Sequence, residues 1–263
     1  MIGSNLDFGI KPPKSEFDVT NPKSINEILN RHSPSAILCL SNVNIRESEQ
    51  NPLQAYKVNV IGVYYLTKAA REKKIPLILI STGAVFSGDI HESFNEDSTP
   101  NPLNIYGQTK YLAEILTLES SDRNLVIRTG WLFGSDKNSK KKNIFDKMLD
   151  LAIEGKEIKA TYDQYGSPTY MKDLVSELKK LITNNASGIY HIVNSGRASA
   201  AEFIEEAAKY LKHESRIERA SVAEFQSTIK RSPSECLDSK RIKLRHWAEA
   251  LKDYLGTILA TET

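Results

Sequence analysis

The stretch IPLILIS (Ile75–Ser81), followed directly by Thr82 and Gly83, decides the fold. Its short, continuous apolar run is typical of a strand that is buried in a parallel sheet. Active residues of open α/β sheets lie just beyond the carboxyl ends of such strands. Thr82 is therefore expected at the edge of a functional site, and the alternative for it is an ordinary turn residue.

Outward from this strand, apolar runs alternate with helical patterns in both directions along the chain. Further strands are expected at Met1–Asn5, Ser35–Leu40, Asn124–Thr129 and Ile189–Val193. Helices are expected from Pro22, over Pro52–Glu72, over Asn104–Leu118, and around residues 144–152, 171–181, 203–211 and 247–255. In the Pro52–Glu72 helix, the residues expected to face inward are Leu53, Tyr56, Val60 and Val63. This alternation predicts βαβ crossovers and a parallel sheet, hence the α/β class.

The chain has 263 residues, enough for one large domain or for a domain with a smaller lobe. Residues 1–134 are interpreted as a Rossmann-like nucleotide-binding domain. Residues 135–263 are interpreted as a smaller substrate lobe, partly interwoven with the first domain. The basic stretch Asp136–Lys142 between them is expected to be a solvated surface loop, and the alternative is a contact with a ligand phosphate.

Composition excludes several function classes. Lysine and arginine number 35 against 33 acidic residues, a balance that argues against a nucleic-acid partner. The two cysteines, Cys39 and Cys236, cannot form a disulfide framework or a four-thiolate zinc site, and we expect no metal. No apolar run is long enough to span a membrane, and the N-terminus lacks the apolar run of a signal peptide. A cytoplasmic location is expected.

The residues Tyr106 and Lys110 form a Y-x-x-x-K pattern on a predicted helix. Four residues make about one helical turn, so the phenol and the ammonium lie on one face. A nearby lysine is expected to lower the tyrosine pKa, and such a tyrosine can exchange a proton with a hydroxyl or carbonyl oxygen. Tyr64 and Lys68 share the same spacing by chance, and we interpret that pair as an ordinary amphipathic helix face.

A set of motifs, in order and running nearly end to end, resembles the dTDP-4-dehydrorhamnose reductase family of extended short-chain dehydrogenase/reductases. The matching segments are FDVTNP (Phe17–Pro22), YKVNVIG (Tyr56–Gly62), LISTGAVFSG (Leu79–Gly88), PLNIYGQTKYLAE (Pro102–Glu114), VIRTGWLFG (Val126–Gly134), DQYGSPTY (Asp163–Tyr170), GIYHIVNSG (Gly188–Gly196) and RSPSECLDSKRI (Arg231–Ile242). The resemblance implies reduction of a 4-keto group on a nucleotide-linked deoxysugar, with hydride supplied by NADPH or NADH.

The resemblance also implies roles for residues. Thr82, Tyr106 and Lys110 match a catalytic trio: Tyr106 is the proton donor, Lys110 lowers its pKa and holds the nicotinamide ribose, and Thr82 orients the keto oxygen. The other positions implied in cofactor binding are Asp18, Leu40, Ser41 and Asn59, and those implied in substrate binding are Ile45, Trp131, Asn143 and Arg231.

Several of these positions have structural alternatives. Trp131 has core packing as its alternative, Asp18 a cap that precedes a helix, and Arg231 a surface salt bridge. Asn59, in the middle of a predicted helix, either caps a kink or holds a backbone group near the lysine. His191 is interpreted as a structural histidine.

The sequence departs from the family at its start. Gly3 and Gly9 are the only early glycines, and no glycine-rich turn follows a strand. Such turns let backbone amides bind a pyrophosphate at a helix N-terminus. The chain is therefore expected to begin after the family's first strand, loop and helix, with MIGSNLDFG resembling its second strand. A gap in the sheet and weakened cofactor binding are expected to follow. Two substitutions put the exact sugar in question: Ala84 replaces a tyrosine, and Leu40 replaces a smaller residue.

Three hypotheses for function stay open. The first is a sugar-nucleotide reductase, and the retained trio favours it. The second is a non-catalytic binding or regulatory subunit similar to the methionine adenosyltransferase β subunit, which the missing glycine turn favours. The third is an epimerase or reductase that acts on another nucleotide sugar. All three imply a nucleotide sugar as small-molecule partner, and all allow a homodimer.

Overall fold

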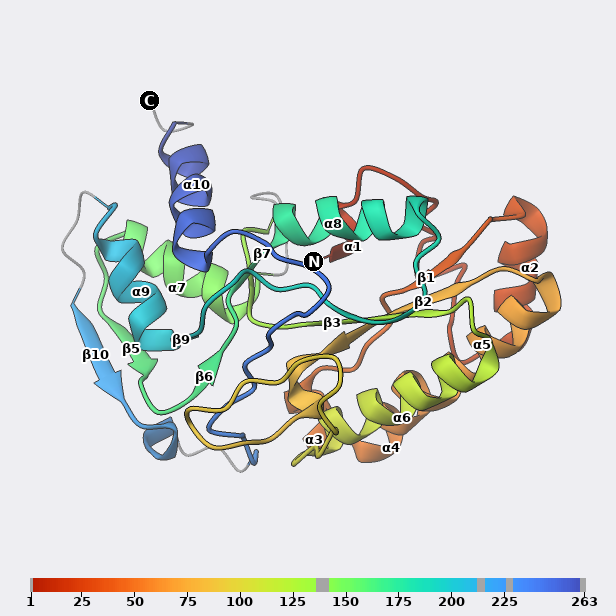
Figure 1. The fold of residues 1–263 in the computed structure, drawn as a ribbon, viewed down its shortest axis with the longest axis horizontal. Helices are drawn as coiled ribbons and strands as arrows, with labels where there is room; N and C mark the ends of the chain where they lie inside the picture. Colours follow the sequence, from red (N-terminus) through yellow and green to blue (C-terminus); the bar gives the residue numbers. More distant parts are fainter. Residues whose placement is uncertain (1, 136–141, 212–215, 226–228, 261–263) are drawn as a thin grey trace.

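The computed structural model describes residues 2–135, 142–211, 216–225 and 229–260. Four parallel strands form its main sheet in the order β1 (Ile37–Cys39), β2 (Leu77–Thr82), β3 (Leu125–Thr129) and β8 (Gly188–His191) (Figure 1). The central strand β2 is the IPLILIS segment, and five of its six residues are buried. The expected parallel α/β sheet is confirmed.

Helices cover both faces of this sheet, as in a doubly wound Rossmann-like fold. On one face, α2 (Pro22–His32), α5 (Gly62–Lys73) and α6 (Ile105–Ser120) enclose a core with Leu77, Leu79 and Val126. On the other face, α8 (Met171–Thr183) packs on Ile78, Ile80 and Ile127. Figure 1 shows α8 above the strands and α6 below them.

The remaining elements are short or belong to the second half of the chain. They are α3 (Ile45–Gln50), α4 (Pro52–Tyr56), a π-helix (Lys57–Ile61), a 3-10 helix (Gly83–Val85), β4 (Leu132–Phe133), α7 (Ile144–Ile153), β5 (Ile158–Thr161), β6 (Tyr165–Gly166), β7 (Thr169–Tyr170), β9 (Ala198–Ser199), α9 (Ala200–Ala208), β10 (Ile217–Ala220), a second 3-10 helix (Val222–Phe225) and α10 (Trp247–Leu259). Within the described part of the chain, every helix is too short or too polar to cross a bilayer.

The first residues form a helix, so the expected strand at Met1–Asn5 is wrong. The helix α1 (Ile2–Asn5) packs with Leu6 and Phe8 against α8, and Asp7 forms an ion pair with Lys179 of α8 at 2.8 Å. The expected gap in the sheet is also wrong. Among the described residues β1 pairs only with β2, so β1 is an edge strand and the sheet is continuous from it.

The predicted helix over Pro52–Glu72 is present but is interrupted by the π-helix. A π-turn contains an extra residue and changes which positions face the core. Ala55, Asn59 and Val63 are buried, whereas Leu53 is 79% exposed. The expected inward position of Leu53 is therefore wrong.

The second half of the chain has its own core around Phe133, Phe145 and Phe203, enclosed by α7, α9 and α10. Two of its elements, α8 and β8, belong to the main sheet, which makes the halves interwoven. Residues 136–141 of the predicted basic loop lie outside the described residues, and Lys142 is paired with Asp150 at 2.7 Å.

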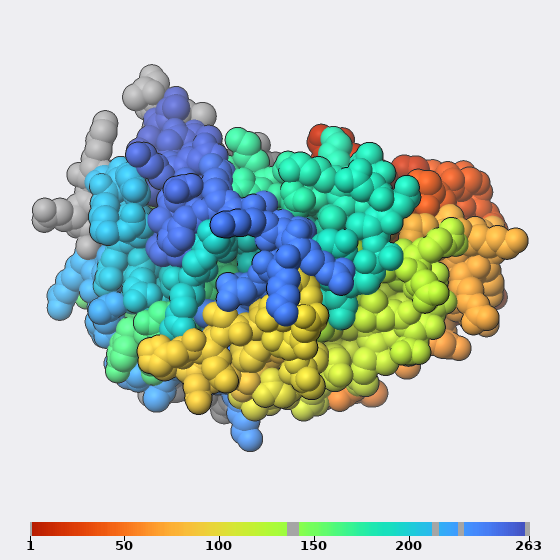
Figure 2. Space-filling view, viewed as in Figure 1, coloured from red at the N-terminus to blue at the C-terminus, as the bar shows by residue number. Residues whose placement is uncertain are grey.

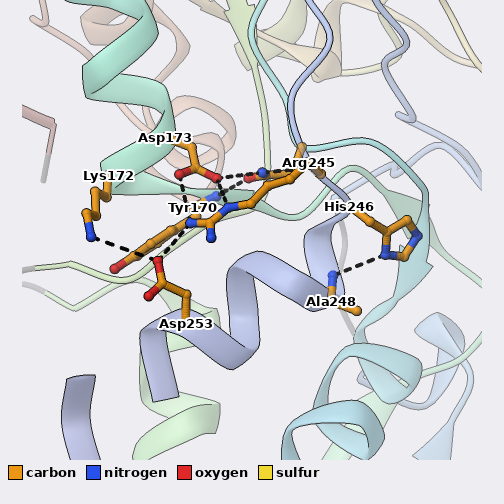
Figure 3. Close-up of polar contacts among 8 residues, drawn as sticks. Tyr170, Lys172, Asp173, Arg245, His246, Ala248 and Asp253 are labelled. Carbon is orange, nitrogen blue, oxygen red and sulfur yellow. Dashed lines mark hydrogen bonds and ion pairs between the residues drawn. The ribbon is translucent and has the colours of Figure 1, made fainter. Parts of the chain in front are cut away.

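Residues 231–246, here called the crossing segment, run between the two halves (Figure 1). In Figure 2 this part of the chain is the blue region across the middle of the visible face. Figure 3 shows how its end is held: the Arg245 guanidinium lies between Asp173 of α8 and Asp253 of α10. The two charge-assisted bonds to Asp173 measure 2.8 and 2.9 Å, and the bond to Asp253 measures 2.9 Å. This pairing ties the crossing segment to both halves.

Candidate active site

The carboxyl ends of β1, β2 and β3 meet at one edge of the sheet, as parallel strands require. Thr82 ends β2 and lies beside Thr129, the last residue of β3, in the strand register. Asn42 follows β1 by three positions. These three polar residues therefore belong to the same edge, where the fold class places ligands.

Helix α6 brings Tyr106 to this edge. Asn104 caps the helix because its Oδ1 accepts a hydrogen bond from the Gly107 amide at 2.8 Å, and its Nδ2 donates to the Lys230 carbonyl at 3.1 Å. Tyr106 lies in the first turn of α6. The side chains of Thr82 and Asn42 lie close enough to its phenol to lower the phenol pKa. Thr82 and Tyr106, two members of the predicted trio, are thus brought together.

Two glycines allow the segments of the site to approach one another. A Cβ at Gly107 would lie 2.2 Å from the Ala84 carbonyl oxygen, so only glycine lets α6 reach the turn after β2. A Cβ at Gly83 would lie 2.6 Å from the Glu235 carbonyl oxygen, so the crossing segment touches the same turn. Three segments that are far apart in sequence converge on Thr82.

We expect Gly107→Ala to destabilise the protein by about 1–3 kcal/mol, because backbone must move to admit the methyl group. Gly256→Ala is the matched control. It lies in the interior of α10, and a Cβ there meets no atom within 4 Å. Alanine at position 256 should raise stability by about 0.5–1 kcal/mol. Urea unfolding of both variants measures the difference, and equal stability of the two would contradict the close approach at Gly107.

The electrostatics of Tyr106 differ from the expectation. Burial, the largest effect, and the charge of Glu235 raise the pKa of Tyr106 to about 12, while the hydrogen bonds from Thr82 and Asn42 lower it. The Lys110 ammonium points elsewhere: its Nζ donates to the Ile80 carbonyl at 2.6 Å. Burial lowers the pKa of Lys110 itself. The expectation that Lys110 lowers the Tyr106 pKa is therefore wrong.

A tyrosine with this pKa is a proton donor rather than a base. Tyr106 keeps its proton at every physiological pH, because its pKa of about 12 lies far above that range. An alkoxide that forms on a reduced carbonyl is a strong base and can take that proton. The site therefore suits protonation of an oxygen during reduction.

A buried ionic network lies directly beneath the site. Glu114, one turn after Lys110, accepts hydrogen bonds from the Arg128 guanidinium at 2.7 and 3.0 Å and from the Ser81 hydroxyl. Arg128 and Glu114 are at most 2% exposed. The Arg128 guanidinium also lies 4.9 Å from the centre of the Phe86 ring. The network fixes β2, β3 and α6 relative to one another.

His191 is structural, as interpreted from the sequence. Its side chain is fully buried, and its Nδ1 lies 2.8 Å from the Asp238 carbonyl oxygen. Burial, followed by the charge of Arg128, lowers the His191 pKa to about 4, so its imidazole is neutral. Its one N–H, on Nδ1, donates to the Asp238 carbonyl, so His191 holds the crossing segment rather than acting as an acid.

The candidate cofactor residues Asn59 and Asp18 have structural partners. The Asn59 amide accepts from the Val43 amide at 2.8 Å and donates to the Val43 carbonyl and the Thr109 hydroxyl at 3.2 and 3.0 Å. It holds the loop after β1 against α6, the backbone-holding role considered from the sequence. The exposed Asp18 accepts two bonds of 2.8 Å from Thr20, which form a local turn before α2. These bonds lower the Asp18 pKa.

Leu40 and Ser41 continue the chain beyond β1, and both are partly buried. The Leu40 side chain packs toward α1, with its Cδ1 3.4 Å from the position of a Cβ on Gly3. Burial raises the pKa of the neighbouring Cys39 thiol, and the Ser41 backbone lowers it by a smaller amount. The N-terminal segment therefore lies beside Leu40, one of the candidate cofactor positions.

Two of the candidate substrate residues, Trp131 and Asn143, have well-defined structural contacts. Trp131 has a φ of 45°, rare for a bulky residue, and its ring lies over Gly166 and 4.9 Å from the Phe145 ring. Asn143 caps α7: its Oδ1 accepts from the Asp146 amide, and its Nδ2 donates to the Asp146 carboxylate, both at 2.8 Å.

The other two candidate substrate residues, Ile45 and Arg231, lie apart from Trp131 and Asn143 in the sequence. Ile45 is the first residue of α3 and is partly buried. Arg231 is exposed, and its charge acts on Glu235. The chance pair Tyr64 and Lys68 lies on the exposed face of α5, as interpreted.

Two residues of the site were not found from the sequence. Asn42 follows β1 on a loop with no distinctive motif, and only its distance from the strand end hints at its place. Glu235 acts on Tyr106 across about 130 positions of the chain, a proximity that no local pattern could indicate.

The family model described as "RmlD substrate binding domain" matches residues 4–259. The chain belongs to this family. It is thereby a member of the extended short-chain dehydrogenase/reductase superfamily.

Relatives of this RmlD-family chain match it along most of its length. It is 30% identical to the spore coat polysaccharide biosynthesis protein SpsK of Bacillus subtilis, covering 92% of this chain and 86% of that one. It is also 30% identical to a dTDP-4-dehydrorhamnose reductase of Aggregatibacter actinomycetemcomitans, covering 94% and 87%. The crystal structure of the Bacillus anthracis dTDP-4-dehydrorhamnose reductase in complex with NADP superposes with a TM-score of 0.89 at 28% identity, covering 97% and 94%.

The described residues of this RmlD-family chain fit the nicotinamide half of a cofactor. The Thr129 hydroxyl at the carboxyl end of β3 is buried and has no partner among the described residues, which leaves a polar group for a ligand beside Thr82 and Tyr106. The described residues do not provide a binding site for the cofactor pyrophosphate in the same way. In residues 2–135, no glycine-rich turn leads from a strand into a helix. The nicotinamide half therefore fits the site and the pyrophosphate cradle is not formed by these residues.

Proposed function

We propose that this chain reduces the 4-keto group of a nucleotide-linked deoxysugar, as the names of its reductase relatives indicate. The observation that carries the proposal is the Tyr106 phenol, which keeps its proton and lies beside Thr82 at the carboxyl edge of the sheet. The family match supplies the reaction class, and the site supplies a proton donor in the place where that class needs one.

The chain's own residues act on the keto oxygen. The Thr82 Oγ1 accepts from the Ala84 amide at 3.2 Å, which fixes the hydroxyl beside the Tyr106 phenol, where its proton can turn to a bound carbonyl oxygen. Tyr106 then gives its proton to that oxygen as negative charge develops. A nicotinamide cofactor, when bound, supplies the hydride to carbon. Lys110 and Glu114 hold the helix and strand that position Tyr106.

The proposal is tested by supplying dTDP-4-keto-6-deoxy sugar with NADPH and identifying the product. We expect the keto carbon to become a hydroxyl-bearing carbon. A cytoplasmic location, a homodimer and the lack of a nucleic-acid partner stay predictions of the sequence.

The 263-residue chain should bind NADPH weakly, with a dissociation constant above about 100 µM. Each charge-assisted bond from a pyrophosphate cradle is worth about 1.5–3 kcal/mol, so losing two weakens binding by about two orders of magnitude or more. Calorimetry with NADPH and with reduced nicotinamide mononucleotide measures this. We expect the dissociation constants of NADPH and of reduced nicotinamide mononucleotide to agree within about threefold. Micromolar binding of NADPH but not of the mononucleotide would show that the chain does bind the pyrophosphate.

A non-catalytic sugar-nucleotide-binding subunit is the second candidate, and the edge position of β1 favours it, because no described strand or glycine turn completes the cofactor side. It predicts binding of the nucleotide sugar without turnover at any cofactor concentration. The first candidate predicts turnover at high cofactor concentration.

A further inference from the structure

We propose that Glu235 is a substrate-binding residue. Its carboxyl group binds the sugar hydroxyl next to the keto carbon and selects sugars that carry that hydroxyl. This inference rests on the proposed function, since it assigns the sugar to the place where Tyr106 and Thr82 meet a carbonyl oxygen.

The backbone around Glu235 is held rigidly at the site. The Glu235 amide donates to the Tyr165 carbonyl at 3.0 Å, and the Leu237 amide donates to the Ser167 hydroxyl at 2.9 Å. The Ser234 hydroxyl donates to the Glu92 carbonyl at 2.6 Å. Glu235 also lies against Gly83, the residue that follows Thr82. A side chain on such a fixed segment holds its position relative to the reacting oxygen.

The Glu235 side chain begins at the turn that follows Thr82, because its Cβ lies 3.6 Å from the position of a Cβ on Gly83. Its charge raises the Tyr106 pKa, which places the two groups within electrostatic reach. Glu235 also raises the pKa of Cys236, and among the described residues the charge of Arg231 lowers the pKa of Glu235. Among the described residues, no hydrogen bond or ion pair reaches the Glu235 carboxylate. Glu235 is only partly buried, so its carboxyl group is open to a ligand, and a ligand hydroxyl would supply the hydrogen-bond partner that the described residues do not.

A neutral hydroxyl is the partner that this carboxyl fits best. Burial raises the Glu235 pKa to about 7, so both protonation states are populated near neutrality. A hydroxyl can donate to the ionised form and accept from the protonated form. A diphosphate, by contrast, is repelled by the ionised form. The sugar end of the substrate is therefore assigned to Glu235.

The test compares two probes: a dTDP-4-keto-6-deoxy sugar with a hydroxyl on C3, and its 3-deoxy analogue. Calorimetry measures the affinity of each for the wild type, Glu235→Gln, Glu235→Ala and Asp238→Asn. Asp238 is the control because it is exposed on the same segment and its replacement removes the same charge. We expect Glu235→Ala to weaken binding of the C3-hydroxyl sugar about 10- to 100-fold. The analogue should change by less than about threefold.

Glu235→Gln should lose less affinity than Glu235→Ala, because an amide still pairs with a hydroxyl, and Asp238→Asn should bind like the wild type. Equal weakening of both sugars by Glu235→Ala would overturn the inference, as would no weakening of either. Because binding is measured without turnover, a wild type that binds but does not reduce the sugar contradicts the proposed function alone.

Discussion

Replacing Tyr106 by phenylalanine should lower kcat by about 10²–10⁴-fold, with the fold intact. The substitution keeps the ring and its packing in the first turn of α6 but deletes the only proton that the residue can transfer. General acid catalysis contributes a factor of this size. Initial rates of keto-sugar reduction at saturating substrate and cofactor give kcat for the variant and for the wild type.

Tyr64→Phe is the matched control, because Tyr64 has the same spacing to a lysine but is 46% exposed on α5. We expect it to change kcat by less than about twofold. A Tyr106→Phe enzyme with near-native turnover would exclude Tyr106 as proton donor. Equal loss in both variants would show that the damage is structural.

Replacing Arg128 by methionine should cost about 3–5 kcal/mol of unfolding free energy. The change leaves the Glu114 carboxylate buried without its partner, and an uncompensated buried charge is strongly destabilising. It also removes the guanidinium that lies over Phe86. Urea unfolding monitored by circular dichroism measures the loss.

Two controls separate the charge effect from lost packing. The double variant Arg128→Met with Glu114→Gln should recover part of the stability, since neither charge is left alone. Lys240→Met breaks an ion pair with Asp97 whose side chains are 59% and 71% exposed, and should cost less than about 1 kcal/mol. If Arg128→Met cost no more than Lys240→Met, the buried network would not be what fixes the strands beneath the site.

The sheet and the position of Tyr106 could be predicted from the sequence because each depends on local patterns. The apolar run of β2 and the cap at Asn104 specify a buried strand and a helix start without reference to distant residues. Thr82 and Tyr106 then follow from the positions of those two elements.

What could not be predicted depends on tertiary contacts. The helix at Ile2–Asn5 forms against α8, a partner about 170 positions away. Leu53 is exposed because a π-turn intervenes, and nothing in the hydrophobic pattern marks that turn. The raised pKa of Tyr106 needs the burial and the Glu235 charge that only the folded chain brings together. Lys110 has helical spacing from Tyr106, but its ammonium donates to the Ile80 carbonyl.

The most direct test of the reductase assignment is the transfer of deuterium from cofactor to sugar. The chain is incubated with a dTDP-4-keto-6-deoxy sugar and millimolar NADPH that carries deuterium at the transferred position, and the product is analysed by mass spectrometry and NMR. The Bacillus anthracis reductase serves as positive control. We predict one deuterium on C4 of the product, lost in Tyr106→Phe. A sugar recovered unchanged from the wild type, while the control enzyme labels it, would contradict the assignment.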